Sequence, residues 1–498
     1  MKPRILWIDD EIVTLEPLIK LLENAGYYVI PAASGDKGIE ILLNDRIDLV
    51  LLDEIMPGKD GLAVLNDMHA LGIDVPVVMV TKVEDADFIT ETLSKKVAGF
   101  VIKPIKFAQL YAVVKQILEQ PQLVEKELPK EYTRFYNNVM ERLNRGDITP
   151  EGWIDIYKSL LKWDISIDIP GFHELHDGLW EKVEKHFSQY VEHHYRDWVE
   201  GTGPLLSPYV VKEELLPFLY EHKRMLFLLM DCMRFDVWWA IKKELTPMYH
   251  IDESAYYSIL PTATPFARNA IFSGEFPIDF VKQYPDAWRN NECERPAFMK
   301  RWGGTKNVAF VKIIKSEDAE VLPDILANYK RYPLIVVVVN LIDMLVHRPK
   351  HGLLYEVVQD IKGLRDLSAL WFSKSMLLNF IRGLHSHGYA IFLTTDHGAI
   401  LGRKGVKIYG GEHISPSLRY KYDRFIKVED KRAAMLINEP RGYRLAPENM
   451  QFAIAKEDYF FIYPTHPDVY EKRYKFLFQH GGISLQEMII PLVKLEPL

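Results

Sequence analysis

Several segments in the second half of this chain place an acidic or imidazole side chain directly after an apolar run. Met225 to Met230 leads into Asp231, and Ala390 to Thr395 leads into Asp396 and His397. Apolar runs of this length are typical of buried strands. A charge at the end of such a strand is costly unless it is paired or bound to a metal ion. These positions therefore predict ligands for a metal ion.

Further ligands of the same kind follow elsewhere in this half. The apolar run from Leu334 to Val339 precedes Asp343 and His347, whose spacing of four places both on one face of a helix. His480 precedes two glycines, where the backbone can approach closely. Two neighbouring zinc ions need about six or seven protein ligands. The candidates are Asp231, Asp343, His347, Asp396, His397 and His480.

A hydroxyl nucleophile would complete this ligand set. The loop from Leu260 to Pro265 carries two threonines, Thr262 and Thr264. A threonine hydroxyl is inert at neutral pH unless a metal or a base lowers its pKa. Two Zn²⁺ ions would balance three aspartates and one alkoxide, so the assembled site could admit a phosphate ester. The expected chemistry is metal-dependent, in-line attack on phosphorus.

Two arginines lie near these segments in the sequence. Arg234 and Arg268 could contact oxygens of the substrate. Either could instead pair with a carboxylate such as Asp236.

The first 120 residues alternate short apolar runs with amphipathic segments, which predicts five βα units and a doubly wound parallel sheet. The expected strands are 5–8, 28–30, 49–52, 75–80 and 100–102. Ligands of such sheets bind beyond the carboxyl ends of the strands. The residues at those ends are Asp9, Asp10, Asp53, Thr81 and Lys103. Three clustered carboxylates repel one another, so we expect Mg²⁺ among them.

This set of residues resembles that of two-component receiver domains. The resemblance implies that Asp53 accepts a phosphoryl group from a sensor histidine kinase. It implies that Asp9, Asp10, Asp53 and the backbone carbonyl of Ile55 surround Mg²⁺. It also implies switch roles for Thr81, Lys103 and Phe100.

The rest of the chain changes character twice. Residues 121–205 carry apolar side chains at helical spacing and predict a small helical bundle. Residues 206–498 alternate strands and helices again and predict a second, larger α/β domain. We therefore expect three domains, with boundaries after residues 120 and 205.

The larger domain resembles the alkaline phosphatase superfamily, and more narrowly its PglZ branch. The segments that carry the resemblance are 231–236, 260–264, 270–274, 395–398 and 480–484. The resemblance implies that Thr264 is the nucleophile, with Thr262 as the alternate. One zinc ion would be held by Asp231, Thr264, Asp396 and His397, and the other by Asp343, His347 and His480.

The order of the three domains resembles PorX-type response regulators of Bacteroidetes type IX secretion. That resemblance implies a phosphodiesterase for cyclic and linear oligonucleotides, with a role in secretion and gliding. It further implies homodimers on phosphorylation and contacts with a sigma factor and a secretion-motor protein.

Two other functions remain open from the sequence. One is a signalling adaptor with a vestigial phosphatase-like fold, in which phosphorylation of Asp53 only exposes a docking surface. The other is a phosphomonoesterase or mutase of the same superfamily. The zinc content of the protein would distinguish the adaptor from the enzyme. A comparison of monoester and diester hydrolysis would distinguish the phosphomonoesterase or mutase from the phosphodiesterase.

Composition limits the cellular setting. The 498 residues contain 48% hydrophobic and 26% charged residues, as is ordinary for globular proteins. The formal charge of −8 disfavours a surface that binds nucleic acid throughout. Two cysteines exclude a disulfide scaffold, and no signal peptide or membrane-spanning run is expected. The sequence predicts a cytoplasmic protein.

Overall fold

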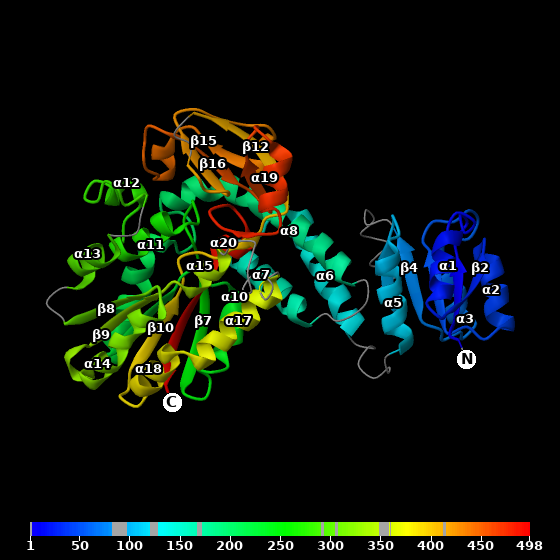
Figure 1. Cartoon of the computed structure of the whole chain (residues 1–498), viewed down its shortest axis with the longest axis horizontal. Helices are drawn as coiled ribbons and strands as arrows, with labels where there is room; N and C mark the ends of the chain where they lie inside the picture. Colours follow the sequence, from blue (N-terminus) through cyan, green and yellow to red (C-terminus); the bar gives the residue numbers. More distant parts are fainter. Residues whose placement is uncertain are drawn as a thin grey trace. The chain divides into compact units, whose positions relative to one another are not determined.

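The structure is a computed structural model, drawn as a cartoon in Figure 1. It describes residues 2–81, 97–119, 128–166, 172–289, 293–303, 307–347, 358, 360–411 and 415–498. The chain forms two compact units. One contains residues 1–148 and 162–183, and the other contains residues 149–161 and 184–498.

The N-terminal sheet has the predicted doubly wound, parallel form. Among the described residues its strand order is β2-β1-β3-β4-β5. The strands are β1 (Arg4–Ile8), β2 (Tyr28–Ala32), β3 (Leu49–Asp53), β4 (Val77–Thr81) and β5 (Gly99–Ile102). The helices are α1 (Glu16–Asn24), α2 (Gly35–Asn44), α3 (Gly61–Ala70) and α5 (Phe107–Glu119). Buried side chains such as Trp7, Leu51 and Val78 form the core. Because β1 and β3 are neighbouring parallel strands, their carboxyl ends bring Asp9 and Asp53 to one edge of the sheet.

Three long helices follow this sheet in the chain. They are α6 (Leu128–Arg145), α7 (Pro150–Ser166) and α8 (Phe172–Val199). Apolar residues at helical spacing, including Trp153, Tyr157 and Leu160, are buried as the sequence pattern predicts. The two compact units divide α7 and α8 between them. The predicted boundaries at 120 and 205 stay predictions, and residues 120–127 and 167–171 lie outside the described part.

The second α/β sheet, also predicted, is mixed. In the part of the chain that is described, its order is β7-β19-β10-β6-β9-β8. The strands are β6 (Met225–Met230), β7 (Tyr249–Tyr257), β8 (Val308–Ile313), β9 (Leu334–Val339), β10 (Ala390–Thr394) and β19 (Ile489–Pro497). Strands β8, β9, β6 and β10 are parallel, and β19 runs antiparallel to β10. In the register, Leu229 of β6 pairs with both Val338 and Thr394, so β6, β9 and β10 end together.

Helices accompany this sheet. The longer ones are α10 (Phe235–Lys242), α11 (Thr264–Ser273), α17 (Ile361–Lys374) and α18 (Met376–His385). The shorter ones are α9 (Leu216–His222), α12 (Pro277–Phe280), α13 (Glu294–Phe298), α14 (Leu322–Ala327), α15 (Leu341–Val346), α19 (Pro467–Tyr474) and α20 (Leu485–Met488). No helix in the described residues is long and apolar enough to cross a membrane.

Smaller strands occur between β10 and β19 in the chain. Strand β11 (Ile400–Leu401) pairs with β18 (Phe478–Gln479), which directly precedes His480. Two three-stranded sheets lie between them, as far as the chain is described. One contains β12 (Lys404–Gly410), β14 (Ile426–Val428) and β17 (Tyr459–Ile462), and the other β13 (Tyr420–Asp423), β15 (Ala434–Ile437) and β16 (Gln451–Ala455).

Candidate metal centre

The first cluster lies at the carboxyl ends of the neighbouring strands β6 and β10. Asp231, Asp396 and His397 are all buried, and each offers a ligand atom within 4.8 Å of the others. His397 Nε2 lies 3.8 Å from Asp231 Oδ1 and 3.8 Å from Asp396 Oδ2. Thr264 approaches the same nitrogen, with its Oγ1 at 3.2 Å. The structure therefore brings together the four residues predicted for one zinc ion.

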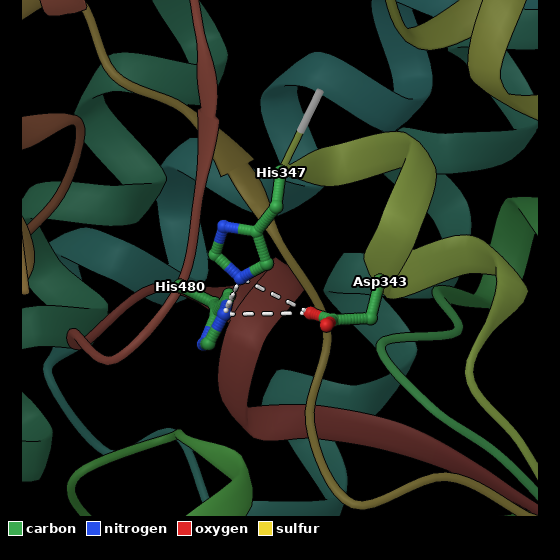
Figure 2. Close-up of side chains that lie close together, drawn as sticks. All are labelled: Asp343, His347 and His480. Carbon is green, nitrogen blue, oxygen red and sulfur yellow. Dashed lines mark hydrogen bonds and ion pairs between the residues drawn. The ribbon is translucent and has the colours of Figure 1, made fainter. Parts of the chain in front are cut away.

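The second cluster contains Asp343, His347 and His480 (Figure 2). Asp343 lies in α15 and His347 follows that helix directly, so their spacing of four places them on one face as expected. His347 Nε2 is 3.2 Å from Asp343 Oδ1 and 2.7 Å from His480 Nε2. His480 Nε2 is 3.5 Å from Asp343 Oδ1. The remaining three predicted zinc ligands thus also converge.

The donor atoms of both clusters suit a metal ion. Metal-binding histidines usually bond through one ring nitrogen and donate the other N–H to a carbonyl or carboxylate. His397 Nδ1 is 3.1 Å from the Gly398 carbonyl, and His480 Nδ1 is 3.3 Å from the Thr262 carbonyl. In each case Nε2 faces the cluster. In the described part of the chain, Asp231 Oδ1 is buried without a hydrogen-bond partner. This oxygen, the two Nε2 atoms and the acidic neighbours form a donor set typical of zinc sites.

A buried arginine compensates part of the acidic charge of the first cluster. Arg268, on α11, is fully buried and forms ion pairs with Asp231, Asp396 and Glu294. Its Nε lies 2.9 Å from Asp396 Oδ2. Burial opposes ionisation of Asp396, but Arg268 and His397 hold the pKa of its carboxyl well below the usual range. Burial raises the pKa of Asp231, and the neighbouring charges of Asp396 and Asp343 reinforce that shift, despite Arg268.

In the second cluster, the pKa values of the two histidines shift in opposite directions. Burial and the nearby His397 and His347 lower the pKa of His480 well below its usual value. The hydrogen bond to Asp343 raises the pKa of His347. Burial opposes ionisation of Asp343, yet its bond to His347 and the neighbouring histidines lower its pKa to about 2. His347 Nε2 lies within bonding distance of both the Asp343 carboxylate and His480 Nε2.

The structure distinguishes the two threonines of the loop before α11. Thr262 is fully buried, donates to the Gly482 carbonyl at 2.8 Å and accepts from Gly481 N at 3.2 Å. Thr264 is half-buried, begins α11 and faces His397. The hydroxyl of Thr264 is therefore the one directed at the candidate ligands.

The suggested substrate role of Arg234 has no support from its position. Its side chain is 1% exposed, and its Nε donates to Asp236 Oδ1 at 2.9 Å. Its Nη1 donates to the Ala399 carbonyl at 3.0 Å. Pairing with Asp236 is the alternative that the sequence left open. Arg268 likewise pairs with carboxylates, so its predicted substrate contact stays a prediction.

Sequence reasoning did not find two polar neighbours of Arg268. Glu294 Oε1 accepts from Arg268 Nη1 at 3.2 Å, and Asn340 Oδ1 lies 3.4 Å from the same nitrogen. Asn340 follows β9 as Asp231 follows β6, so the register of the strands could have indicated it. Glu294 follows no apolar strand and carries no local signal.

The N-terminal sheet also gathers its predicted residues. Ligand atoms of Asp9, Asp10 and Asp53 lie within 4.8 Å of one another. Lys103 Nζ is 2.8 Å from Asp53 Oδ1 and 3.2 Å from Asp9 Oδ2. Burial raises the pKa of Asp53, with Asp9 adding to the shift and Lys103 opposing it. Burial opposes the charge of Lys103, but its bonds to Asp53 and Asp9 raise its pKa above the usual value.

Two further predicted switch residues, Thr81 and Phe100, lie on the neighbouring strands β4 and β5. Thr81 ends β4, and its hydroxyl donates to the carboxylate of Glu54. Phe100 is buried in β5, whereas Ile55 is 67% exposed two residues beyond Asp53. The magnesium and switch roles of these residues stay predictions.

Protein-family models match both regions of the chain in which candidate sites were found. The family model of the BREX system PglZ alkaline phosphatase-like domain matches residues 210–495, more than half of the chain. The chain belongs to the PglZ family. Ahead of this PglZ domain, the response regulator receiver model matches residues 5–115, and the PorX response regulator linker model matches residues 122–199. The architecture is that of PorX-type response regulators.

Similarity to individual curated proteins covers about a quarter of this chain. The transcriptional regulatory protein ZraR of Escherichia coli O157:H7 is 33% identical over 125 residues, 25% of this chain and 28% of that protein. DltR of Streptococcus agalactiae serotype III is 31% identical over 121 residues, 24% of this chain and 54% of that protein. The chain thus spans between about a quarter and half of the length of these relatives.

Solved receiver structures also cover about a quarter of this chain. A CheY-like receiver domain protein of Methanospirillum hungatei is 27% identical and covers 24% of this chain and 95% of its own, with a TM-score of 0.23. A response regulator of Clostridium difficile is 26% identical and covers 24% and 98%, also with a TM-score of 0.23. The protein is a two-component response regulator with a PglZ output domain. Receiver and alkaline phosphatase-like domains generally use metal ions.

Proposed function

We propose that this response regulator is a phosphorylation-gated, zinc-dependent phosphodiesterase that cleaves cyclic and linear oligonucleotides. The observation that carries the proposal is the position of Thr264. Its hydroxyl lies 3.2 Å from His397 Nε2, beside two clusters that together contain three carboxylates and three imidazoles. A hydroxyl, acidic oxygens and imidazole nitrogens in this arrangement suit phosphoryl transfer.

Seven residues would hold two zinc ions. Asp231, Thr264, Asp396 and His397 would bind one, and Asp343, His347 and His480 the other. When bound, the zinc ions would stabilise negative charge on the phosphate and lower the pKa of the hydroxyl. The Mg²⁺ of the receiver would be held by Asp9, Asp10, Asp53 and the carbonyl of Ile55.

Thr264 would carry out the nucleophilic attack of the proposed reaction. Thr264 Oγ1 would attack phosphorus, and the bond from phosphorus to the leaving sugar oxygen would break. Thr264 loses its hydroxyl proton as its bond to phosphorus forms, the departing oxygen takes up a proton, and a nucleotidyl ester remains on Thr264. Water then cleaves this ester and restores the hydroxyl. Thr264 stands in the first turn of α11, and the positive end of the helix dipole there favours an anion such as the transferred phosphate.

The PorX-type architecture supports the proposed biological setting. We propose roles in type IX secretion and gliding, contacts with a sigma factor and a secretion-motor protein, and homodimers on phosphorylation of Asp53. A cytoplasmic location follows from the same proposal. Two buried free cysteines, Cys232 and Cys293, are consistent with a reducing compartment.

Hydrolysis of bis-p-nitrophenyl phosphate tests the enzymatic proposal. Wild-type protein should turn over the diester, lose activity on zinc chelation and regain it when zinc is added. Thr264→Val should be inactive at any zinc concentration. Turnover that survives either chelation or this substitution would refute the proposal.

One observation favours a signalling adaptor as the second candidate. Arg268 already forms ion pairs with Asp231 and Asp396, so a side chain of the protein compensates part of their charge. Zinc content after purification separates the two functions. About two zinc ions per chain support the enzyme, and none supports the adaptor.

A further inference from the structure

A buried glutamate of helix α8 lies outside both metal clusters and has no role in the proposed reaction. Glu184 is 6% exposed, and its two carboxylate oxygens lie 3.3 and 3.2 Å from the backbone N of Leu485. In the described part of the chain this N–H is its one hydrogen-bond donor. The contact joins residue ranges that match different family models, the PorX linker and the PglZ domain, yet both residues belong to the same compact unit.

Several hydrogen bonds within the bonded segment, and one ion pair to Arg419, tie its residues to one another. Leu485 begins α20, and Ser484 caps that helix by accepting from Glu487 N. The Glu487 carboxylate accepts from Gly482 N at 2.8 Å and from Arg419 Nη2 at 2.5 Å. All five residues are buried. A displacement at Leu485 would therefore be transmitted toward Gly482.

The same segment carries a candidate metal ligand. Gly481 N donates to Thr262 Oγ1, which donates in turn to the Gly482 carbonyl. His480 Nδ1 bonds to the Thr262 carbonyl, two residues before Thr264. Hydrogen bonds and short covalent steps thus lead from α8 to His480 and to the loop of the nucleophile.

We propose that Glu184 is a positioning residue through which α8 holds His480 and the Thr262–Thr264 loop in place. Displacement of α8 would then alter both metal retention and turnover. A buried N–H without its acceptor has no water to replace it, so losing this bond favours movement of the segment. The turnover part of this inference rests on the proposed function.

The chemistry of Glu184 suggests a conservative variant. Burial raises the pKa of Glu184 well above its usual value, and the nearby Glu487 adds to the shift. Its role as an acceptor therefore does not require a negative charge. Glutamine keeps a carbonyl oxygen at nearly the same place, so Glu184→Gln should preserve the bond that Glu184→Ala removes. Glu200→Ala is the matched control, because Glu200 lies just beyond α8 and is exposed.

The full chain carrying each substitution is compared in three measurements. These are hydrogen exchange of the peptide 478–488, zinc affinity by competition with a chelator, and turnover of bis-p-nitrophenyl phosphate. In Glu184→Ala, the backbone amides of this peptide should exchange faster. The variant should also bind the less tightly held of its two zinc ions about 10-fold more weakly, because a hydrogen bond that supports a metal ligand is lost. Glu184→Gln and Glu200→Ala should resemble the wild type in all three.

Unchanged exchange and zinc affinity in Glu184→Ala would overturn the inference. So would a Glu184→Gln variant as impaired as Glu184→Ala, because charge rather than the hydrogen bond would then matter. Faster exchange spread equally over strands β6 and β9 would also overturn it, since it would show general unfolding. Exchange and zinc affinity do not depend on catalysis. If both change as expected in a chain without diesterase activity, the proposed function fails while the positioning role stands.

Discussion

The rings of His397 and His480 stack on each other, with centroids 4.3 Å apart and planes 18° from parallel. His397 belongs to the cluster at the ends of β6 and β10, whereas His480 contacts His347 in the second cluster. The stack therefore makes one continuous centre from two groups of ligands. Removal of either ring should affect both groups.

Substitution of His480 should lower the zinc content. His480→Ala removes a ligand of the second cluster and the ring that packs on His397, so we expect about one zinc ion per chain instead of two. Turnover should fall about 100-fold or more, because the remaining site lacks its partner. Elemental analysis of the purified protein measures the zinc content. His250→Ala serves as the control, since His250 is exposed on β7. Retention of two zinc ions in His480→Ala would contradict the assignment.

Substitution of Thr264 should mainly lower turnover, whereas substitution of Thr262 should mainly lower stability. Thr264→Val should lower turnover about 1000-fold or more with little change in melting temperature, because it removes the nucleophilic hydroxyl from a half-buried position. Thr262→Val leaves Gly481 N without its acceptor, so the free energy of unfolding should fall by about 1–3 kcal/mol while measurable turnover remains. Diesterase assays and thermal melts of both variants check this. The reverse pattern would make Thr262 the nucleophile.

Arg268 should stabilise the metal-free protein. Arg268→Met leaves Asp231, Asp396 and Glu294 buried without their shared cation. In the presence of a chelator we expect the free energy of unfolding to fall by about 3–5 kcal/mol. Added zinc should restore part of this loss, because it binds the folded state.

Thermal melts with chelator and with zinc test the role of Arg268. Arg441→Met is the control, since Arg441 forms an exposed pair with Glu448 and should change stability by less than about 1 kcal/mol. An equal loss of stability with and without zinc would show that the acidic cluster does not bind the metal.

Lys421 should give the output domain a distinctive pH dependence. Its side chain is 1% exposed, and burial lowers the pKa of Lys421 from 10.5 to about 7. Between these two values the unfolded chain binds a proton that the folded chain does not. Stability should therefore rise with pH across this window, by at most about 1.4 kcal/mol per pH unit. Below the window the lysine is charged in both states, so it contributes no slope.

Lys421→Met removes this titration. The melting temperature of the wild type should increase relative to that of the variant between pH 7 and pH 9. Melts of both proteins at the two pH values measure the difference directly. Parallel pH profiles would show that Lys421 does not titrate in this range. Lys427→Met is a suitable control, because Lys427 is exposed on β14, the next strand along the chain.

Phosphorylation of the receiver should require both Asp53 and Lys103. Asp53→Asn should abolish labelling by acetyl phosphate with Mg²⁺. Lys103→Ala should slow labelling about 100-fold, because Lys103 Nζ lies 2.8 Å from Asp53 and can stabilise the transferred phosphoryl group. Phosphate-affinity gels follow the reaction. Lys106→Ala, at an exposed position, should be labelled normally. Labelling of Asp53→Asn would place the acceptor elsewhere.

The sequence alone was enough to predict both α/β sheets and the residues at their strand ends. Strands β6 and β9 were predicted with the bounds that the structure shows. This succeeds because an apolar run that ends in a polar residue is a local signal, and parallel strands bring such ends together. Asp231 and Asp396, which are 165 residues apart in the chain, follow from that rule alone.

Tertiary structure decided which partner each buried polar group takes. The local sequence pattern does not separate the hydroxyls of Thr262 and Thr264, and packing directs Thr264 toward His397. Sequence likewise gave no reason to pair Arg268 with Glu294 or Glu184 with Leu485. A buried charge or amide must find a partner, but the chain segment that supplies it is set by long-range packing rather than by local pattern.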